Sequence, residues 1–221
     1  MALQVNLLGG LQVCPDGQGE ALVFPTRKAA ALLAYLACPP GRAHARNKLA
    51  ALLWSDRPDT QARASLRQEL YALRRELSPF EPKALRLQGD SVTLEGASVE
   101  VDVLHFRRLV SDGTPTSLEG AVALYQGDFL EGLAPDAPLF EEWLVIERER
   151  LREQAGEALA KLFAHQRSAG EIEAALQTGL RLLAFEPGQE PVHRAVIRLQ
   201  LLLGRRGAAL RCANTSLAWT P

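Results

Sequence analysis

The pattern of hydrophobic and polar positions changes twice along the 221-residue chain. Short apolar runs come first: Leu3–Gly9 and Leu11–Cys14 flank a Gly-Gly pair, and a turn sequence, Asp16–Gly19, leads into Ala21–Phe24. Connections this short leave no room for a crossover helix, so consecutive strands must run antiparallel. The first 24 residues therefore predict a small antiparallel sheet.

Three helical patterns follow the predicted sheet. Thr26 is placed to cap the first, which Pro39-Pro40-Gly41 ends, and the second runs from about Ala45 to Trp54. The third, Thr60–Leu77, begins after the break "SDRPD" and repeats leucines at intervals of four, three and four residues. That spacing indicates one buried helix face, formed by Leu66, Leu70, Leu73 and Leu77.

A hairpin pattern and a final strand complete this part of the chain. Two alternating runs surround Gly89-Asp90, and Val99–Val103 reads as the last strand. The order of strands, three helices and hairpin is that of a winged helix-turn-helix with an extra N-terminal sheet. The third helix takes the recognition position, and the predicted domain is 1–101.

Beyond Asp102 the sequence carries helical patterns alone. Asp102 can cap the first, the longest begins at Glu141 with Trp143 and Ile146 among its apolar positions, and two helix pairs follow. Helices of this length joined by short Gly/Pro turns resemble tetratricopeptide hairpins. The fold class is thus mainly α with a small N-terminal antiparallel sheet, and 102–221 is predicted as an all-α second domain.

Charge separates the two parts more clearly than composition does. The net charge is −1, yet residues 27–86 hold 12 Lys+Arg against 5 Asp+Glu, a balance of +7, whereas residues 101–221 hold 13 against 16, a balance of −3. A basic segment before a mildly acidic one suggests modules with different partners.

The exposed side of the third helix suggests what the basic segment contacts. At about 100° per residue, Gln61, Ala64, Gln68, Tyr71 and Arg75 point away from the leucines, and Arg63, Arg67 and Arg74 line one shoulder. Arginine and glutamine around a small residue suit base edges and phosphates of a DNA major groove. A solvated basic face is the competing interpretation of the helix taken alone.

Other classes of function have less support in the sequence. Cys14, Cys38 and Cys212 are far apart, the four histidines are scattered, and we expect reduced thiols, no metal and no cofactor. Adjacent acids such as Glu141-Glu142 project in different directions on a helix, there is no GxxxxGK[ST], and no catalytic residues are predicted. Apolar runs are too short for a membrane span and no secretory signal is visible, which predicts a cytoplasmic protein.

The sequence also resembles a known family. The segment "PTRKAAALLAYLACPPGRAHARNKLAALLWSDRPDTQARASLRQELYALRREL" and the later motifs "VDVLHFRRLV", "ALYQGDFLEGL" and "FEEWLVIERERLRE" resemble bacterial regulators of the Streptomyces antibiotic regulatory protein type. Those regulators join an OmpR-type winged helix to a tetratricopeptide-like bacterial transcriptional activator domain. The resemblance covers about residues 3–205, and after Arg206 the chain departs from the usual family pattern.

The resemblance implies an activator at the bacterial nucleoid that binds direct repeats of promoter DNA as a pair of protomers and recruits RNA polymerase. Carried over by position, Ala64, Arg67, Gln68 and Tyr71 are candidate base contacts. Candidate phosphate contacts are Arg63, Arg74, Arg75, Arg46, Asn47, Lys48, Arg27 and Lys28, with Arg86 near the tip of the wing. Arg27 is equally compatible with a structural ion pair, and the segment Gln88–Ser91 with a mere tight turn.

Two further expectations concern protein partners. The loop "WSDRPD" lies where related winged helices touch polymerase, so Asp56 and Arg57 are candidate polymerase contacts, whereas Trp54 is expected in the core. A protein-interaction adaptor that uses the helical repeats, with a degenerate winged helix, is the alternative function.

Overall fold

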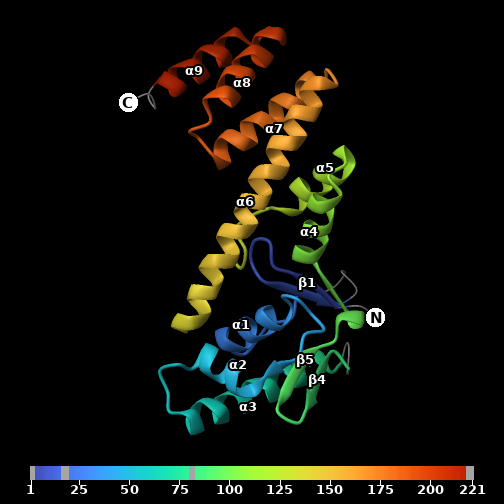
Figure 1. Ribbon diagram of the computed structural model, residues 1–221, viewed down its shortest axis with the longest axis vertical. Coiled ribbons are helices and arrows are strands. Elements are labelled where there is room, and N and C mark those ends of the chain that lie inside the picture. Colours follow the sequence, from blue (N-terminus) through green and yellow to red (C-terminus); the bar gives the residue numbers. More distant parts are fainter. Residues whose placement is uncertain (1–2, 16–19, 80–82, 218–221) are drawn as a thin grey trace. The chain divides into compact units, whose positions relative to one another are not determined.

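The computed structural model of the chain describes residues 3–15, 20–79 and 83–217 (Figure 1). The predicted turn at Asp16–Gly19 lies outside the described residues. The chain divides into two compact units: residues up to Phe106 with Leu124–Leu151, and Arg107–Ala123 with residues from Arg152 onward. The domain division that the sequence predicts after residue 101 stays a prediction.

A three-stranded sheet opens the first unit. β1 (Leu3–Asn6) pairs antiparallel with β2 (Gln12–Pro15), as expected, and parallel with β6 (Val99–Val101) on its other side. The sheet is therefore mixed, because its third strand arrives from far along the chain. The predicted strand Ala21–Phe24 is wrong: this segment has no strand structure, and the Leu22 amide donates a single hydrogen bond to the Val13 carbonyl (2.8 Å).

Asp102 joins this sheet to the helix that follows it. Its Oδ2 accepts hydrogen bonds from the amides of Leu7 and Leu8, each at 2.8 Å, and its Oδ1 accepts from the Val103 amide at 2.7 Å. The carboxyl is largely buried, and burial raises its pKa above the ordinary value despite these donors. The predicted capping residue thus also holds the end of β1.

The three helices of the helix-turn-helix lie close to their predicted ranges: α1 (Arg27–Leu36), α2 (Arg46–Leu53) and α3 (Asp59–Leu77). Thr26 caps α1, because its Oγ1 accepts the Ala29 amide at 2.9 Å. α1 is buried almost all round, which its run of alanines and leucines permits. α2 and α3 pack against each other and against α1.

The hairpin forms as predicted. β4 (Leu85–Gln88) and β5 (Ser91–Leu94) pair antiparallel around a two-residue turn in which Gly89 has φ of +56°. A third strand, β3 (His44–Ala45), pairs with β5, so the wing is a sheet of order β3-β5-β4. The prediction that the second helix begins at Ala45 is wrong by one residue, because Ala45 pairs with Ser91 as a strand residue.

The structure describes six helices in the second half of the chain, and their bounds are close to the predicted ones. They are α4 (Asp102–Asp112), α5 (Pro115–Leu124), α6 (Pro138–Ser168), α7 (Ile172–Phe185), α8 (Glu190–Leu202) and α9 (Arg206–Leu217). A buried core joins α6, α7 and α8 through residues such as Phe163, Leu176 and Val196. The predicted fold class, mainly α with a small sheet and then tetratricopeptide-like helices, is confirmed.

Glycine makes the close approach of α6, α7 and α8 possible. Gly179 is buried inside α7, and a Cβ built there would lie 2.7 Å from Phe163 Cε2 and 2.8 Å from Val196 Cγ2. Next to it, Thr178 Oγ1 donates to Gln166 Oε1 at 2.7 Å, which satisfies a buried polar pair.

One predicted apolar position of α6 is wrong. Ile146 is 65% exposed, whereas the nearby Leu144 is buried. The two positions are two residues apart and so about 200° apart around the helix. Trp143 is half-buried and contacts the rings of Tyr35, Phe129 and Phe140, with centroids 4.9 to 5.8 Å away.

Candidate nucleic-acid interface

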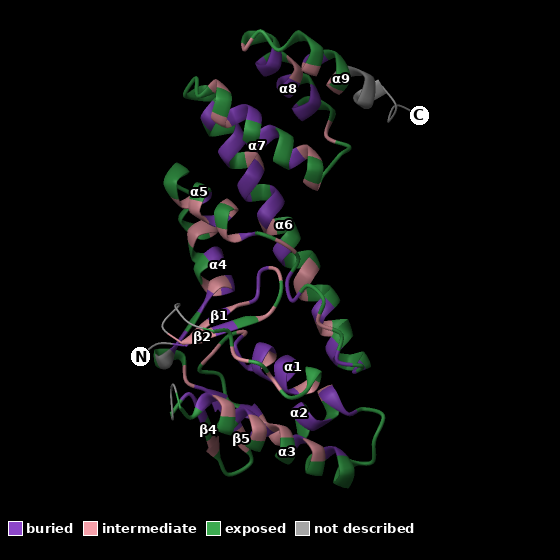
Figure 2. Ribbon diagram, turned by 180° about the vertical axis from the view of Figure 1, so that it is seen from behind, coloured by how far each residue is buried: buried purple, intermediate pink, exposed green. Residues whose placement is uncertain are grey.

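α3 has one buried and one exposed side (Figure 2). Leu66, Leu70, Leu73 and Leu77 are buried, as their spacing predicts, together with Ala62. The predicted base and phosphate contacts of this helix are all exposed: Arg63, Ala64, Arg67, Gln68, Tyr71, Arg74 and Arg75. Tyr71 is 72% exposed, which is unusual for a large aromatic ring and leaves its face free to contact a partner.

The arginines of this face differ in their contacts. Within the described part of the chain, Arg63, Arg67 and Arg74 have no hydrogen-bond or ion-pair partner. Arg75 forms an exposed ion pair with its neighbour Glu76 at 2.8 Å, a contact that solvent screens. Three unpaired guanidinium groups are thus available on α3 itself.

Arg63 and Arg67 also border a hollow between α3, the start of α2 and the turn of the wing. The hollow measures about 320 Å³ and is lined by Arg46, Arg63, Leu66, Arg67, Gly89 and Asp90. The Arg46 amide donates to the Asp90 carbonyl at 2.9 Å, which fixes the wing turn beside α2. Three guanidinium groups against one carboxylate give this hollow a positive charge that suits a phosphate oxygen.

The place of Gly89 and Asp90 in this hollow could not be predicted from the sequence. Arg46 and the wing are distant in the chain, and only the pairing of β3 with β5 brings them together. Asn47 and Lys48 lie beside Arg46 at the start of α2, and both are exposed as expected. Nearby His44 is buried; burial and the charge of Arg42 lower its pKa, so it adds no positive charge here at neutral pH.

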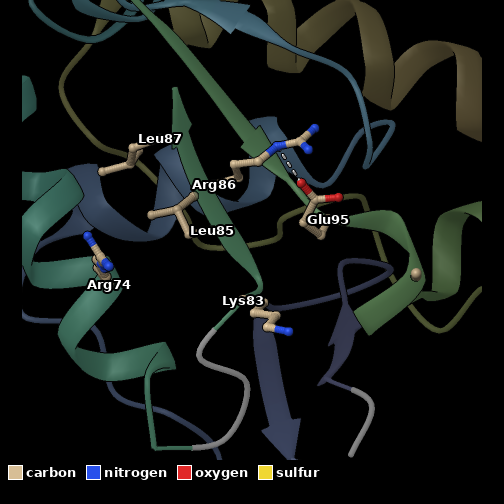
Figure 3. Close-up of a pocket in the computed structure, with 7 residues that line it drawn as sticks. Arg74, Lys83, Leu85, Arg86, Leu87 and Glu95 are labelled. Carbon is tan, nitrogen blue, oxygen red and sulfur yellow. Dashed lines mark ion pairs between the residues drawn. The ribbon is translucent and has the colours of Figure 1, made fainter. Parts of the chain in front are cut away.

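Arg86 is further from the wing tip than Gln88, which directly precedes the turn. Its Nε forms an ion pair with Glu95 Oε1 at 2.7 Å. Figure 3 shows Arg86 and Glu95 on one side of β4, and Leu85, Leu87 and Arg74 on the other. These residues border a second hollow, of about 500 Å³, at the base of the wing.

The two cations at the start of α1, Arg27 and Lys28, contact other groups of the protein. Lys28 Nζ donates to the Leu53 carbonyl at 2.7 Å and lies 5.4 Å from the centre of the Trp54 ring. It therefore caps the end of α2, where the helix dipole favours a cation. Arg27 is exposed, and its Nη1 lies 3.5 Å from the Ala134 carbonyl. A DNA contact by either residue stays a prediction.

The residues of the loop between α2 and α3 are buried or exposed as predicted. Trp54 is 3% exposed and belongs to the core, whereas Asp56 and Arg57 are exposed. Arg57 Nη1 donates to Ser65 Oγ at 3.0 Å, which holds the loop against α3. A hollow of about 400 Å³ lies here, between α2, the loop and the first turn of α3.

Two observations concern other kinds of site. Among residues 3–15, 20–79 and 83–217, no three His, Cys, Asp or Glu side chains lie so that they could hold a metal ion. Within the same ranges, every helix is too short or too polar to cross a membrane.

Comparisons with known proteins address the family. Residues 101–214 match the model of the bacterial transcriptional activator domain. The fold is similar to a solved structure of Mycobacterium tuberculosis EmbR in complex with a low-affinity phosphopeptide, with a TM-score of 0.71 and 22% sequence identity. That similarity covers 97% of this chain and 58% of the EmbR chain, and curated proteins give no match.

The family match covers just over half of the chain and includes the segments that carry the later resemblance motifs. The expected resemblance to Streptomyces antibiotic regulatory protein-type regulators is confirmed, and the chain belongs to the family of transcriptional activators that carry the bacterial transcriptional activator domain.

Proposed function

We propose that the protein is a sequence-specific regulator that inserts α3 into the major groove of promoter DNA and activates transcription. The observation that carries the proposal is the exposed face of α3, where Arg63, Arg67 and Arg74 have no partner among the described residues. Gln68 and Tyr71 lie on the same face, so hydrogen-bond donors with long reach stand beside unpaired cations.

The residues divide into two roles. Ala64, Gln68 and Tyr71 read base edges, because they lie opposite the buried leucines around the helix axis, and Arg67 reaches a base edge from the shoulder beside Gln68. Arg63 and Arg46 hold a phosphate in the hollow beside the wing turn, and Lys48, Arg74 and Arg75 contact neighbouring phosphates. Arg86 remains the proposed DNA contact of the wing. A phosphate would have to displace Glu95 from its ion pair with Arg86.

Arg67→Ala tests the division of roles. Loss of a base contact should weaken binding to a preferred duplex by about 1–3 kcal/mol and leave binding to unrelated duplexes much less affected. Arg206→Ala is the matched control, since it removes one exposed arginine from the second compact unit (the helical unit). Equal weakening on every duplex would assign Arg67 to the phosphates and contradict its role here.

We further propose that Asp56 and Arg57 contact RNA polymerase and that two protomers bind direct repeats. Asp56 is exposed in the loop that Arg57 anchors to Ser65. Asp56→Ala should leave DNA affinity unchanged and lower transcript yield in a purified polymerase assay. Unchanged yield together with unchanged DNA binding would remove Asp56 from the polymerase contact.

A further inference from the structure

A further cluster of arginines lies in the helical unit, which holds none of the residues assigned above to DNA or polymerase. Arg167 comes from the last turn of α6, and Arg194 and Arg198 come from α8. With Glu190, Pro191 and Ala195 they line a hollow of about 230 Å³. Arg194 and Arg198 are four residues apart and so lie on the same side of α8.

The charges in this hollow do not balance. Glu190 pairs with Arg194, the guanidinium of Arg167 lies 5.5 Å from the centre of the Phe163 ring, and Arg198 has no partner in the described ranges. Glu190 is the one acidic residue that lines the hollow among the described residues. Three exposed guanidinium groups therefore face one carboxylate in a half of the chain that is acidic as a whole.

The start of α8 contributes little beyond these side chains. The amides of Glu190, Val192 and His193 already donate to the carbonyls of Gly188 or Gln189 at 3.0 to 3.1 Å, and Pro191 has no amide hydrogen. An anion in the hollow would have to be held by the arginines. Substituting the arginines should consequently remove most of the affinity for an anion.

The chemistry of the hollow favours a carboxylate on a peptide. Arginine forks bind carboxylates with two parallel hydrogen bonds, and the exposed ring of Pro191 offers apolar contact to the methylenes of Asp or Glu. Helical-hairpin units present such surfaces to extended peptides. A nucleic-acid backbone fits less well, because its closely spaced phosphates would meet the exposed Glu190.

We propose that Arg167, Arg194 and Arg198 form a docking site for an acidic segment of a partner protein. One Asp or Glu carboxylate of that segment enters the hollow and replaces Glu190 as the ion-pair partner of Arg194. The site goes beyond the proposed DNA contact and does not depend on it, because none of its residues belongs to α2, α3 or the wing.

A binding experiment on the full chain tests this site. A fluorescein-labelled hexaglutamate peptide is titrated with the wild type, Arg167→Ala, Arg198→Ala and the double variant at low salt, and anisotropy is recorded. We expect the double variant to lose at least about tenfold in affinity, as the loss of charged hydrogen bonds implies. Arg198→Lys should recover part of that loss, because it restores the charge but not the planar fork.

Lys161→Ala is the matched control, because it removes one exposed cation of α6 that is paired with Glu157. It should bind the peptide like the wild type. Wild-type affinity in the double variant, or an equal loss in Lys161→Ala, would overturn the proposal.

Two further arms separate the acidic segment from other anions. Inorganic phosphate that displaces the peptide at concentrations near the peptide's own dissociation constant would make this a phosphate site. A double variant that weakens duplex DNA as much as Arg67→Ala does would assign the arginines to the DNA interface. Either result would contradict an acidic-peptide site, while failure of DNA binding in the wild type would leave the peptide result unaffected.

Discussion

Replacing Gly179 by alanine should destabilise the helical unit, although the same substitution usually stabilises a helix. Inside a helix, Gly→Ala stabilises by about 0.5–1 kcal/mol because alanine has less backbone freedom to lose. At Gly179, however, the new Cβ would lie 2.7 and 3.2 Å from Phe163 Cε2 and Cζ and 2.8 Å from Val196 Cγ2. Both neighbours are buried core residues and cannot swing away.

Overpacking of this kind costs about 1–3 kcal/mol. Set against the propensity gain, the net expectation is a loss of about 1 kcal/mol in the free energy of local unfolding. Hydrogen exchange of the amides of α7 and α8 measures this quantity directly in the full chain, without assuming that both units unfold together.

Gly156→Ala is the matched control, because Gly156 is also a buried glycine in the middle of a helix. Its new Cβ would lie 2.7 Å from Glu186 Oε1, the end of an exposed side chain, and 3.7 Å from Phe185 Cδ1. The glutamate tip can move, so this variant should be as stable as the wild type or up to about 1 kcal/mol more stable. Equal stabilisation by both substitutions would refute the close approach of α6, α7 and α8.

Three other predictions concern the first compact unit, which contains α3. Leu70→Ala should lower its stability by about 2–5 kcal/mol, because it empties a fully buried position of α3, and thermal unfolding would show it. Arg74→Ala should reduce the slope of log affinity against log salt by about 1 and weaken all duplexes similarly; an unchanged slope would exclude a phosphate contact. Asp102→Asn should cost about 1–3 kcal/mol at neutral pH, since its amide group cannot accept from all three backbone donors. The folded-state pKa of Asp102 is raised, so the folded chain binds the proton more tightly than the unfolded chain does. The stability of the wild type relative to Asp102→Asn should therefore fall as the pH rises from about 4 through that raised pKa, and then level off. Urea unfolding across this range measures the difference, and a difference that grows with pH would contradict the raised pKa.

Local signals in the sequence were enough for the helices and the hairpin. The leucine spacing of α3, the Thr26 cap and the Gly89-Asp90 turn each depend on neighbours within a few residues, and all three are present in the structure. The burial pattern of α3 followed from the same spacing, which made its exposed residues predictable.

Features that depend on distant segments could not be predicted in the same way. The parallel pairing of β6 with β1, and the short strand β3 that ties the wing to α2, join residues far apart in the chain. The internal contact of Lys28 with Leu53 and the pairing of Arg86 with Glu95 likewise need the folded arrangement. For the same reason, the arginine hollow of the helical unit left no visible motif.

The measurement that most directly tests the central claim is selection of bound sequences from a random duplex pool, with the wild type and Arg67→Ala/Gln68→Ala in parallel. The proposed reader predicts an enriched motif in the wild type, repeated at about one helical turn, and its loss in the double variant. Salt-sensitive binding without an enriched motif, or the same motif in both proteins, would contradict recognition by this face of α3. The first of these results would favour the adaptor instead.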